Sequence, residues 1–228
     1  MAPRTPPPNV PPHAAVTGPQ SRPDGAETPW LTCGTMVATP EGDVPAGWLR
    51  PGDLVLTQDG GPRPLLWICR AARDLDAPVA CIPSDRFGPG LPAEPLVLSR
   101  AHGVLVSGPQ LELHFGDAEM LAPASAFCAD APAPGADGPG WPAYDLPACH
   151  LFLDRHDMVL AEGIWVETVL RSAENDAALS VLADAWSPLP PSTGPGSHPR
   201  SCRARLMDWE CRVLPDRFAG VAATALAA

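Results

Sequence analysis

Short hydrophobic runs alternate with turn-forming residues through the middle of the chain. The runs are rich in Val, Leu and Ile, and breaks containing Pro, Gly or Asp separate them. Two breaks, Asp59-Gly60-Gly61 and Gly108-Pro109, are typical of hairpin turns. Many short strands separated by turn signals predict an all-β domain. The segments expected to be strands are residues 35–39, 54–57, 63–70, 79–83, 94–98, 102–107, 110–115, 144–153, 157–160 and 164–170.

One later segment has helical periodicity instead. Apolar residues recur at three- and four-residue steps between Ala178 and Trp186, which places them on one helix face. Ser172 stands where an N-cap is expected, and Pro188 follows the last turn. The pattern predicts a helix over 173–186.

Proline is unevenly distributed over the 228 residues. The chain contains 32 Pro and 20 Gly, and the prolines concentrate near both ends and in one internal insertion at about 132–147. Segments of this composition lack the apolar periodicity needed for a packed core. The predicted organisation is a disordered Pro-rich tail at 1–29, one domain at 30–172, an appended helix at 173–186, and a linker with a C-terminal tail at 187–228.

The charge balance argues against several classes of partner. All 15 basic residues are Arg, and with 26 acidic residues the net charge is −11. An acidic chain repels phosphate backbones, so no nucleic-acid binding is expected. No apolar run is long enough for a transmembrane helix, and the first 29 residues lack a signal-peptide core. An odd number of cysteines, seven, predicts free thiols and favours a cytoplasmic location.

A series of short motifs follows the strand pattern. They are Gly34-Thr35, Leu49-x-Pro51-Gly52-Asp53, Ser99-x-x-His102, and a late segment running from His150 through His156 to Ala161-Glu162-Gly163. In this order they resemble the Hint domain shared by Hedgehog autoprocessing domains and inteins, and most closely its stand-alone bacterial Hint-2 subgroup. The resemblance covers about residues 30–172.

The resemblance implies a horseshoe-like β fold and a self-cleaving reaction. In active relatives a cysteine at the first domain residue attacks the carbonyl before it, and a histidine assists departure of the amide nitrogen. Such chemistry needs an ionisable thiol and a group that delivers a proton. The corresponding assisting residues here are Ser99 and His102, with Cys149 or His150 at the late acid–base position. The substrate would be the chain's own N-terminal segment.

Two positions depart from the family pattern. The nucleophile position carries Trp30, and the nearest thiol, Cys33, lies three residues later. In an extended strand an odd offset places a side chain on the opposite face, so Cys33 reacts only if this segment is rearranged. Otherwise Cys33 is a small packed thiol. The final strand ends in Glu167-Thr168 where splicing relatives carry His-Asn, which excludes asparagine cyclisation and protein splicing.

Two functional hypotheses therefore stand side by side. One is an autoprocessing domain that releases its N-terminal segment through Cys33. The other is a degenerate Hint module that serves as an interaction or structural domain for an unknown protein partner. No cofactor is expected, and Cys149, His150 and His156 lack the paired spacing of a zinc site. Cys202 and Cys211 lie near arginines, which lower the pKa of a thiol. Either these two thiols are reactive, or they are part of a short segment that docks on the domain.

Overall fold

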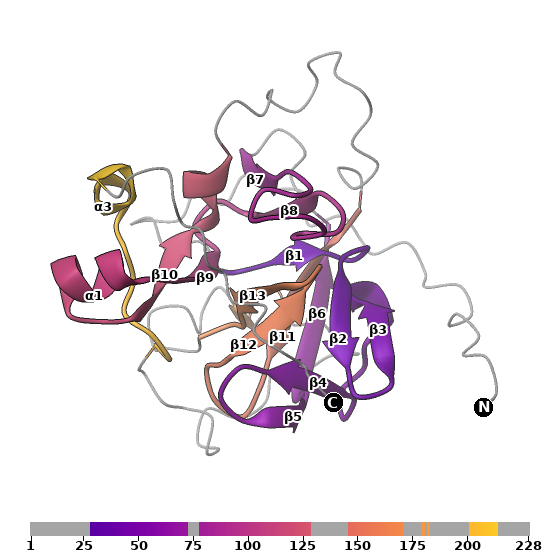
Figure 1. Cartoon of the computed structure of the whole chain (residues 1–228). Helices are drawn as coiled ribbons and strands as arrows, with labels where there is room; N and C mark the ends of the chain where they lie inside the picture. Colours follow the sequence, from indigo (N-terminus) through magenta and orange to yellow (C-terminus); the bar gives the residue numbers. More distant parts are fainter. Residues whose placement is uncertain are drawn as a thin grey trace, which may run out of the picture.

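The computed structural model describes residues 28–72, 78–128, 146–170, 179–180, 182 and 201–213. Strands dominate these residues, and the predicted all-β class is confirmed (Figure 1). The strands are β1 Leu31–Thr32, β2 Met36–Thr39, β3 Gly42–Pro45, β4 Leu54–Thr57, β5 Gly61–Pro64, β6 Trp67–Ala71, β7 Val79–Ile82, β8 Leu96–Ser99, β9 Gly103–Ser107, β10 Glu119–Pro123, β11 Ala148–Phe152, β12 Met158–Ala161 and β13 Ile164–Glu167. The helices are α1 Pro109–Phe115, α3 Asp208–Val213 and the short 3-10 helices η1 Ala46–Trp48 and η2 Ala124–Phe127.

The strands form two sheets. One has the order β6-β11-β1-β8-β7, and the other has the order β10-β9-β13-β12-β2-β3, with the β4–β5 hairpin joined to β12. In the first sheet β1 lies between β11 and β8, which come from distant parts of the sequence. This placement puts Leu31 and Thr32 between backbone and side chains from both neighbours.

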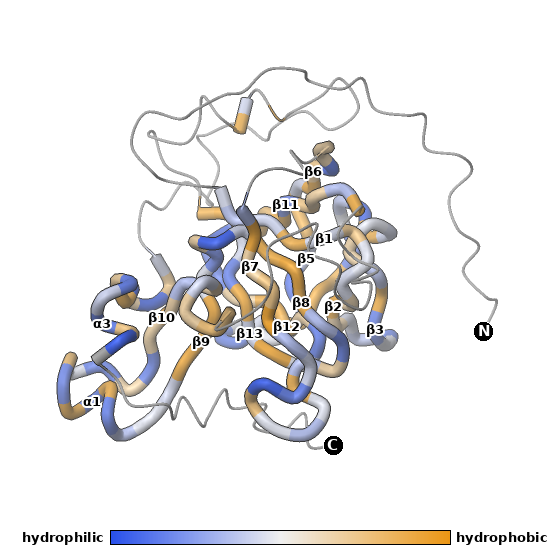
Figure 2. Tube along the Cα trace, turned by 90° about the horizontal axis from the view of Figure 1, so that it is seen from above, coloured by the Kyte–Doolittle hydropathy of each residue, from blue (hydrophilic) through white to orange (hydrophobic). Residues whose placement is uncertain are grey.

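Both sheets contribute to one main hydrophobic core. The alternation of side chains along each strand sends one set inward, and Figure 2 shows hydrophobic residues concentrated along the central strands. Full burial of each such side chain contributes roughly 1.5–3 kcal/mol to stability. Core residues from the first sheet include Leu31, Leu98 and Leu151, and those from the second include Val104, Val159 and Val166.

Residues 63–70, predicted as one strand, form parts of two. β5 pairs with β4 in the second sheet, whereas β6 pairs with β11 in the first. Between them the Leu65 N–H donates to the Asp53 carbonyl at 2.8 Å, and the Leu66 N–H donates to the Phe152 carbonyl at 2.9 Å. The chain crosses from one sheet to the other at this point, which a continuous apolar run does not reveal.

The strand predicted at 110–115 is wrong, because these residues form α1. Pro109 occupies the first turn, where its fixed φ suits a helix and its missing N–H costs nothing. Gly116 ends the helix in the left-handed region at φ 82°. Leu111 is buried while Leu113 is exposed, so one helix face packs where alternation suggested a strand. The predicted hairpin becomes β9–α1–β10.

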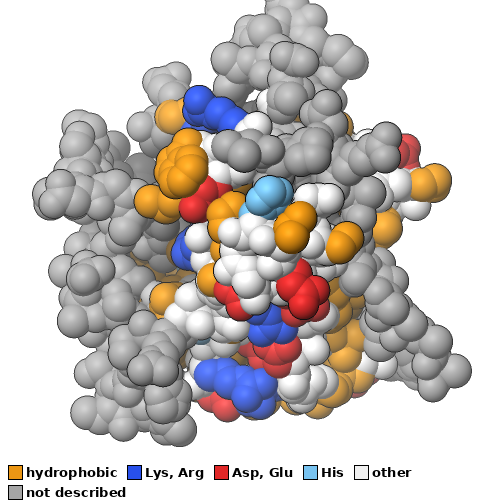
Figure 3. All heavy atoms as spheres, turned by 60° about the vertical axis from the view of Figure 1, so that its left-hand side comes forward, with side chains coloured by type: hydrophobic (Ala, Val, Ile, Leu, Met, Phe, Trp, Pro, Cys, Tyr) orange, Lys and Arg blue, Asp and Glu red, His pale blue; other side chains and the backbone are white. Residues whose placement is uncertain are grey.

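Residues 201–213, called the C-terminal arm below, pack against the domain. Leu121 of β10 donates its N–H to the Ala204 carbonyl and accepts from the Leu206 N–H, both at 2.8 Å. Leu206 is buried, and α3 follows it in contact with η2 and β10 (Figure 1). Figure 3 shows this side of the molecule, where hydrophobic side chains lie among charged ones on the surface. This arm lies within the stretch predicted as linker and tail, but here the free edge of β10 gives its backbone partners.

Other predicted regions lie largely outside the described residues. This holds for the disordered tail, the Pro-rich insertion and most of the helix at 173–186, of which Leu179, Ser180 and Leu182 are helical. Leu179 packs with Trp67 and Phe152 in a second, smaller hydrophobic cluster. Among the helices in the described part of the chain, none has the length and apolar character required to cross a bilayer.

Candidate functional site

The peptide bond between Pro29 and Trp30 is held by groups from β8 and β11. The Pro29 carbonyl accepts a hydrogen bond from Nδ1 of His150 at 2.9 Å. The Trp30 N–H donates to Oγ of Ser99 at 3.4 Å, and the Ser99 N–H donates to the Trp30 carbonyl at 3.1 Å. Nδ1 of His102 also lies 2.9 Å from the Trp30 carbonyl. Ser99 and His150, from distant parts of the sequence, therefore meet at the Pro29–Trp30 peptide, and His102 contacts the carbonyl of the next peptide.

His102 is buried between two carbonyl oxygens. Its Nδ1 faces Trp30, and its Nε2 lies 2.9 Å from the Glu167 carbonyl. Burial lowers the pKa of His102, and the nearby Glu167 charge offsets this only in part. A neutral imidazole has one N–H and donates to only one of the two carbonyls. The ring therefore holds a single proton that either carbonyl can accept.

The buried state of His102 predicts an acid-sensitive fold. Because its folded pKa lies below the unfolded value of about 6.5, its contribution to stability is present above that value and is lost as pH falls toward the folded pKa. We expect the free energy of unfolding in urea to fall between pH 7 and pH 5, by at most ~1.4 kcal/mol per pH unit from this group. His102→Gln should flatten that slope, and an unchanged slope in the variant would contradict the assignment.

The two predicted thiols lie on the other face of the first sheet. Leu31 is opposite Cys149 and also opposite Leu98, and residues directly opposite each other share a face. The Cys33 N–H donates to the Pro147 carbonyl at 2.8 Å, so Cys33 continues the pairing and shares the Cys149 face. Trp30, with Ser99 and His150, faces the opposite way. Ser99 and His150 thus lie on one face of the sheet, and Cys33 and Cys149 lie on the other.

The thiol group has its own electrostatics. A hydrogen bond with Cys149 lowers the pKa of Cys33 against the effect of burial, and the Arg70 charge adds to the lowering. The hydrogen bond with Cys33 and burial raise the pKa of Cys149 well above its ordinary value. Arg70 is fixed by the η1 turn, since its Nε donates to the Gly47 carbonyl at 2.9 Å. One thiol of the pair is therefore disposed to ionise and the other to stay protonated.

A buried charge cluster beside His102 was missed by the sequence reasoning. The side chain of Glu167 is 1% exposed, and Arg205 of the C-terminal arm binds both its oxygens at 2.6 and 2.8 Å. The Gly103 N–H donates to the same carboxylate at 2.6 Å, and Nε2 of His156 lies 3.2 Å from it. Burial alone raises the pKa of Glu167, but His156 and Arg205 outweigh it and hold that pKa below its ordinary value.

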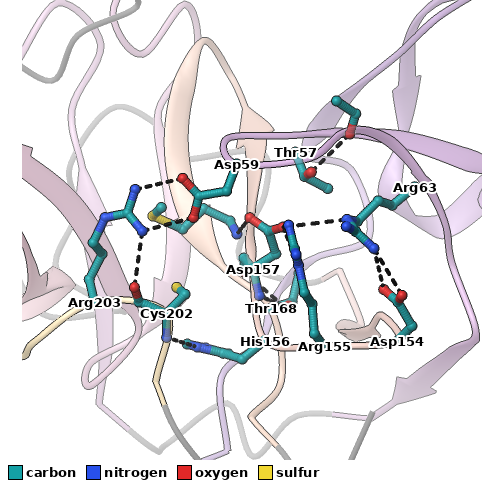
Figure 4. Close-up of polar contacts among 12 residues, drawn as sticks. Thr57, Asp59, Arg63, Asp154, Arg155, His156, Asp157, Thr168, Cys202 and Arg203 are labelled. Atoms are coloured by element: carbon teal, nitrogen blue, oxygen red, sulfur yellow. Dashed lines mark hydrogen bonds and ion pairs between the residues drawn. The ribbon is translucent and has the colours of Figure 1, made fainter. Parts of the chain in front are cut away.

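The C-terminal arm secures this cluster from outside. The Cys202 N–H donates to Nδ1 of His156 at 2.9 Å, and Arg203 binds both oxygens of Asp59 at 2.7 and 2.8 Å (Figure 4). Arg203 also donates to Glu119 at 2.9 Å. Two signals in the sequence could have indicated this cluster: the acidic Glu167 at the end of an apolar strand, and the arginine-rich segment that follows a Pro-rich stretch. Among the described residues, no group of three or more His, Cys, Asp or Glu side chains could hold a metal ion.

The comparisons with known proteins agree with this architecture. A family model described as the Hint domain matches residues 29–173, beginning at the residue whose carbonyl His150 holds. No curated protein and no solved structure matches the chain. Because the family model covers more than half of the sequence and the structure has the expected β-rich fold, the chain belongs to the Hint domain family.

Proposed function

We propose that this chain is a Hint module that retains the Pro29–Trp30 peptide in the position of the self-processing reaction without cleaving it. The observation that supports the proposal is the pair of hydrogen bonds to this peptide, from His150 to the Pro29 carbonyl and from the Trp30 N–H to Ser99. The module would keep its N-terminal segment attached and act as an interaction or structural domain.

The missing component is the nucleophile. An acyl shift at this bond requires a thiol or hydroxyl on the residue after the carbonyl, because the new ester or thioester forms through that atom. The indole of Trp30 offers no such atom. Cys33 and Cys149 lie across the sheet from Ser99 and His150, so neither replaces it in this arrangement.

A second candidate function is autoprocessing through Cys33 at the Thr32–Cys33 bond. It is favoured by the lowered pKa of a partly exposed thiol. Against it, the Thr32 carbonyl accepts from the Thr35 N–H at 3.0 Å, and the Cys33 N–H donates to the Pro147 carbonyl. His102 contacts Trp30 instead, so this reaction needs the segment before Gly34 to rearrange.

Epitope tags at both ends of the chain test the proposal. We expect every molecule purified through the C-terminal tag to keep the N-terminal tag, with or without added thiol. Loss of the N-terminal tag would overturn the proposal. The new N-terminus then identifies the bond, and its disappearance in Cys33→Ala would establish the second candidate.

A further inference from the structure

Cys33 and Cys149 form a cross-strand thiol pair that the proposed function does not use. The pairing of β1 with β11 places them diagonally on one face, because Leu31 is opposite Cys149 and Cys33 bonds to Pro147. The two thiols also hydrogen-bond to each other, which places their sulfurs in contact. Both sulfurs join the same core: Cys149 is a member of the main cluster, and Cys33 packs against it. The pair is thus held together by main-chain bonds.

The two thiols differ in access to solvent. Cys149 is fully buried, whereas Cys33 is partly exposed at the edge of the core. The η1 turn lies over Cys33, since the Gly47 N–H donates to the Cys33 carbonyl at 2.8 Å. Arg70, bonded to the Gly47 carbonyl, adds a fixed positive charge beside the thiols. An oxidant entering from solvent therefore meets Cys33 first, next to a cation and with a second thiol behind it.

We propose that Cys33 and Cys149 are a peroxide-reactive dithiol that converts to an intramolecular disulfide joining β1 to β11. In the first step the Cys33 sulfur attacks a peroxide oxygen, the S–O bond forms, the O–O bond breaks and hydroxide leaves. In the second step the Cys149 sulfur attacks the Cys33 sulfur, the S–S bond forms, and the S–O bond breaks with release of water. Two thiols and one hydrogen peroxide give one disulfide and two waters.

Cys128 provides an internal comparison. It is also partly exposed, but burial raises its pKa, and its sulfur donates to the Ala124 carbonyl at 3.2 Å. Since only the thiolate attacks peroxide, each unit of pKa difference changes the reactive fraction by about tenfold. We expect Cys33 to react faster than Cys128, so that Cys33 is oxidised first at one equivalent of peroxide.

The test treats the full chain with one equivalent of hydrogen peroxide. The chain is then digested by a protease that cuts on the N-terminal side of aspartate, and the disulfides are located by peptide mapping. This digestion places each of the seven cysteines in a separate peptide. We expect a linked pair of the Cys33 and Cys149 peptides, unchanged in the matched Cys128→Ser variant. In Cys149→Ala, dimedone should label Cys33 as a sulfenic acid. Equal oxidation of Cys33 and Cys128, or a disulfide elsewhere, would overturn the proposal. Because the wild-type map needs no substitution, misfolding of a variant leaves the test intact.

Discussion

Trp30→Cys is expected to convert the chain into a self-cleaving protein. The substitution puts a thiol immediately after the Pro29 carbonyl, which His150 already holds at 2.9 Å. Attack at that carbonyl moves the acyl group from nitrogen to sulfur, and added thiol or hydroxylamine then releases residues 1–29. A reaction between adjacent, fixed groups loses little entropy, so we expect cleavage at least ~100-fold above the wild-type background once a nucleophile is present. Intact mass spectrometry over time measures the rate.

The same background separates the roles of the surrounding residues. His102→Ala added to Trp30→Cys should slow cleavage by about 100-fold, a typical loss for a general acid–base group. Cys33→Ala added to Trp30→Cys serves as the matched control and should leave the rate unchanged, because Cys33 faces the other side of the sheet. A Trp30→Cys protein that folds but stays intact would show that the hydrogen bonds to this peptide do not hold it in a geometry that allows the acyl shift.

Arg205→Met is expected to cause the largest loss of stability among single changes in the C-terminal arm. It leaves Glu167, which is 1% exposed, without the cation that binds both its oxygens. Removing one partner of a buried ion pair costs about 3–5 kcal/mol. Because the Arg205 side chain is 41% exposed, solvent screening reduces the expected loss to roughly 2–3 kcal/mol. Urea unfolding at neutral pH measures it.

Arg203→Met is the matched control on the same arm. Arg203 binds Asp59 and Glu119, whose side chains are 35% and 34% exposed, so its loss should cost only about 1 kcal/mol. Adding Glu167→Gln to Arg205→Met removes the stranded charge and should recover part of the loss. Equal effects of Arg203→Met and Arg205→Met would contradict the role assigned to the buried carboxylate.

The local arrangement of this site could be predicted from the sequence better than the contacts around it. The odd offset between Trp30 and Cys33 predicted opposite faces, and the strand register agrees. Alternation along a strand is a local property, so it can be read without the fold. The resemblance in turn placed Ser99 and His102 near the start of the domain, where the structure has them.

Features that depend on distant contacts could not be predicted. Leu111 looked like a strand residue because its neighbours alternate, but Pro109 and Gly116 provide a helix start and stop. Glu167 was noted only as a departure from the splicing pattern. Its role depends on Arg205, which follows a Pro-rich stretch and reaches the site because the arm pairs with β10. Charge complementarity across such a separation becomes visible only in three dimensions.

The most direct test of the central claim is the intact mass of freshly purified wild-type protein incubated with hydroxylamine. Hydroxylamine traps any thioester in equilibrium with the amide, even where that thioester is scarce. If the Pro29–Trp30 bond is held without a nucleophile, the full 228-residue mass of 23.9 kDa persists throughout. Appearance of a product lacking residues 1–29 or 1–32 would contradict the account, and the length of the missing segment would identify the reacting bond.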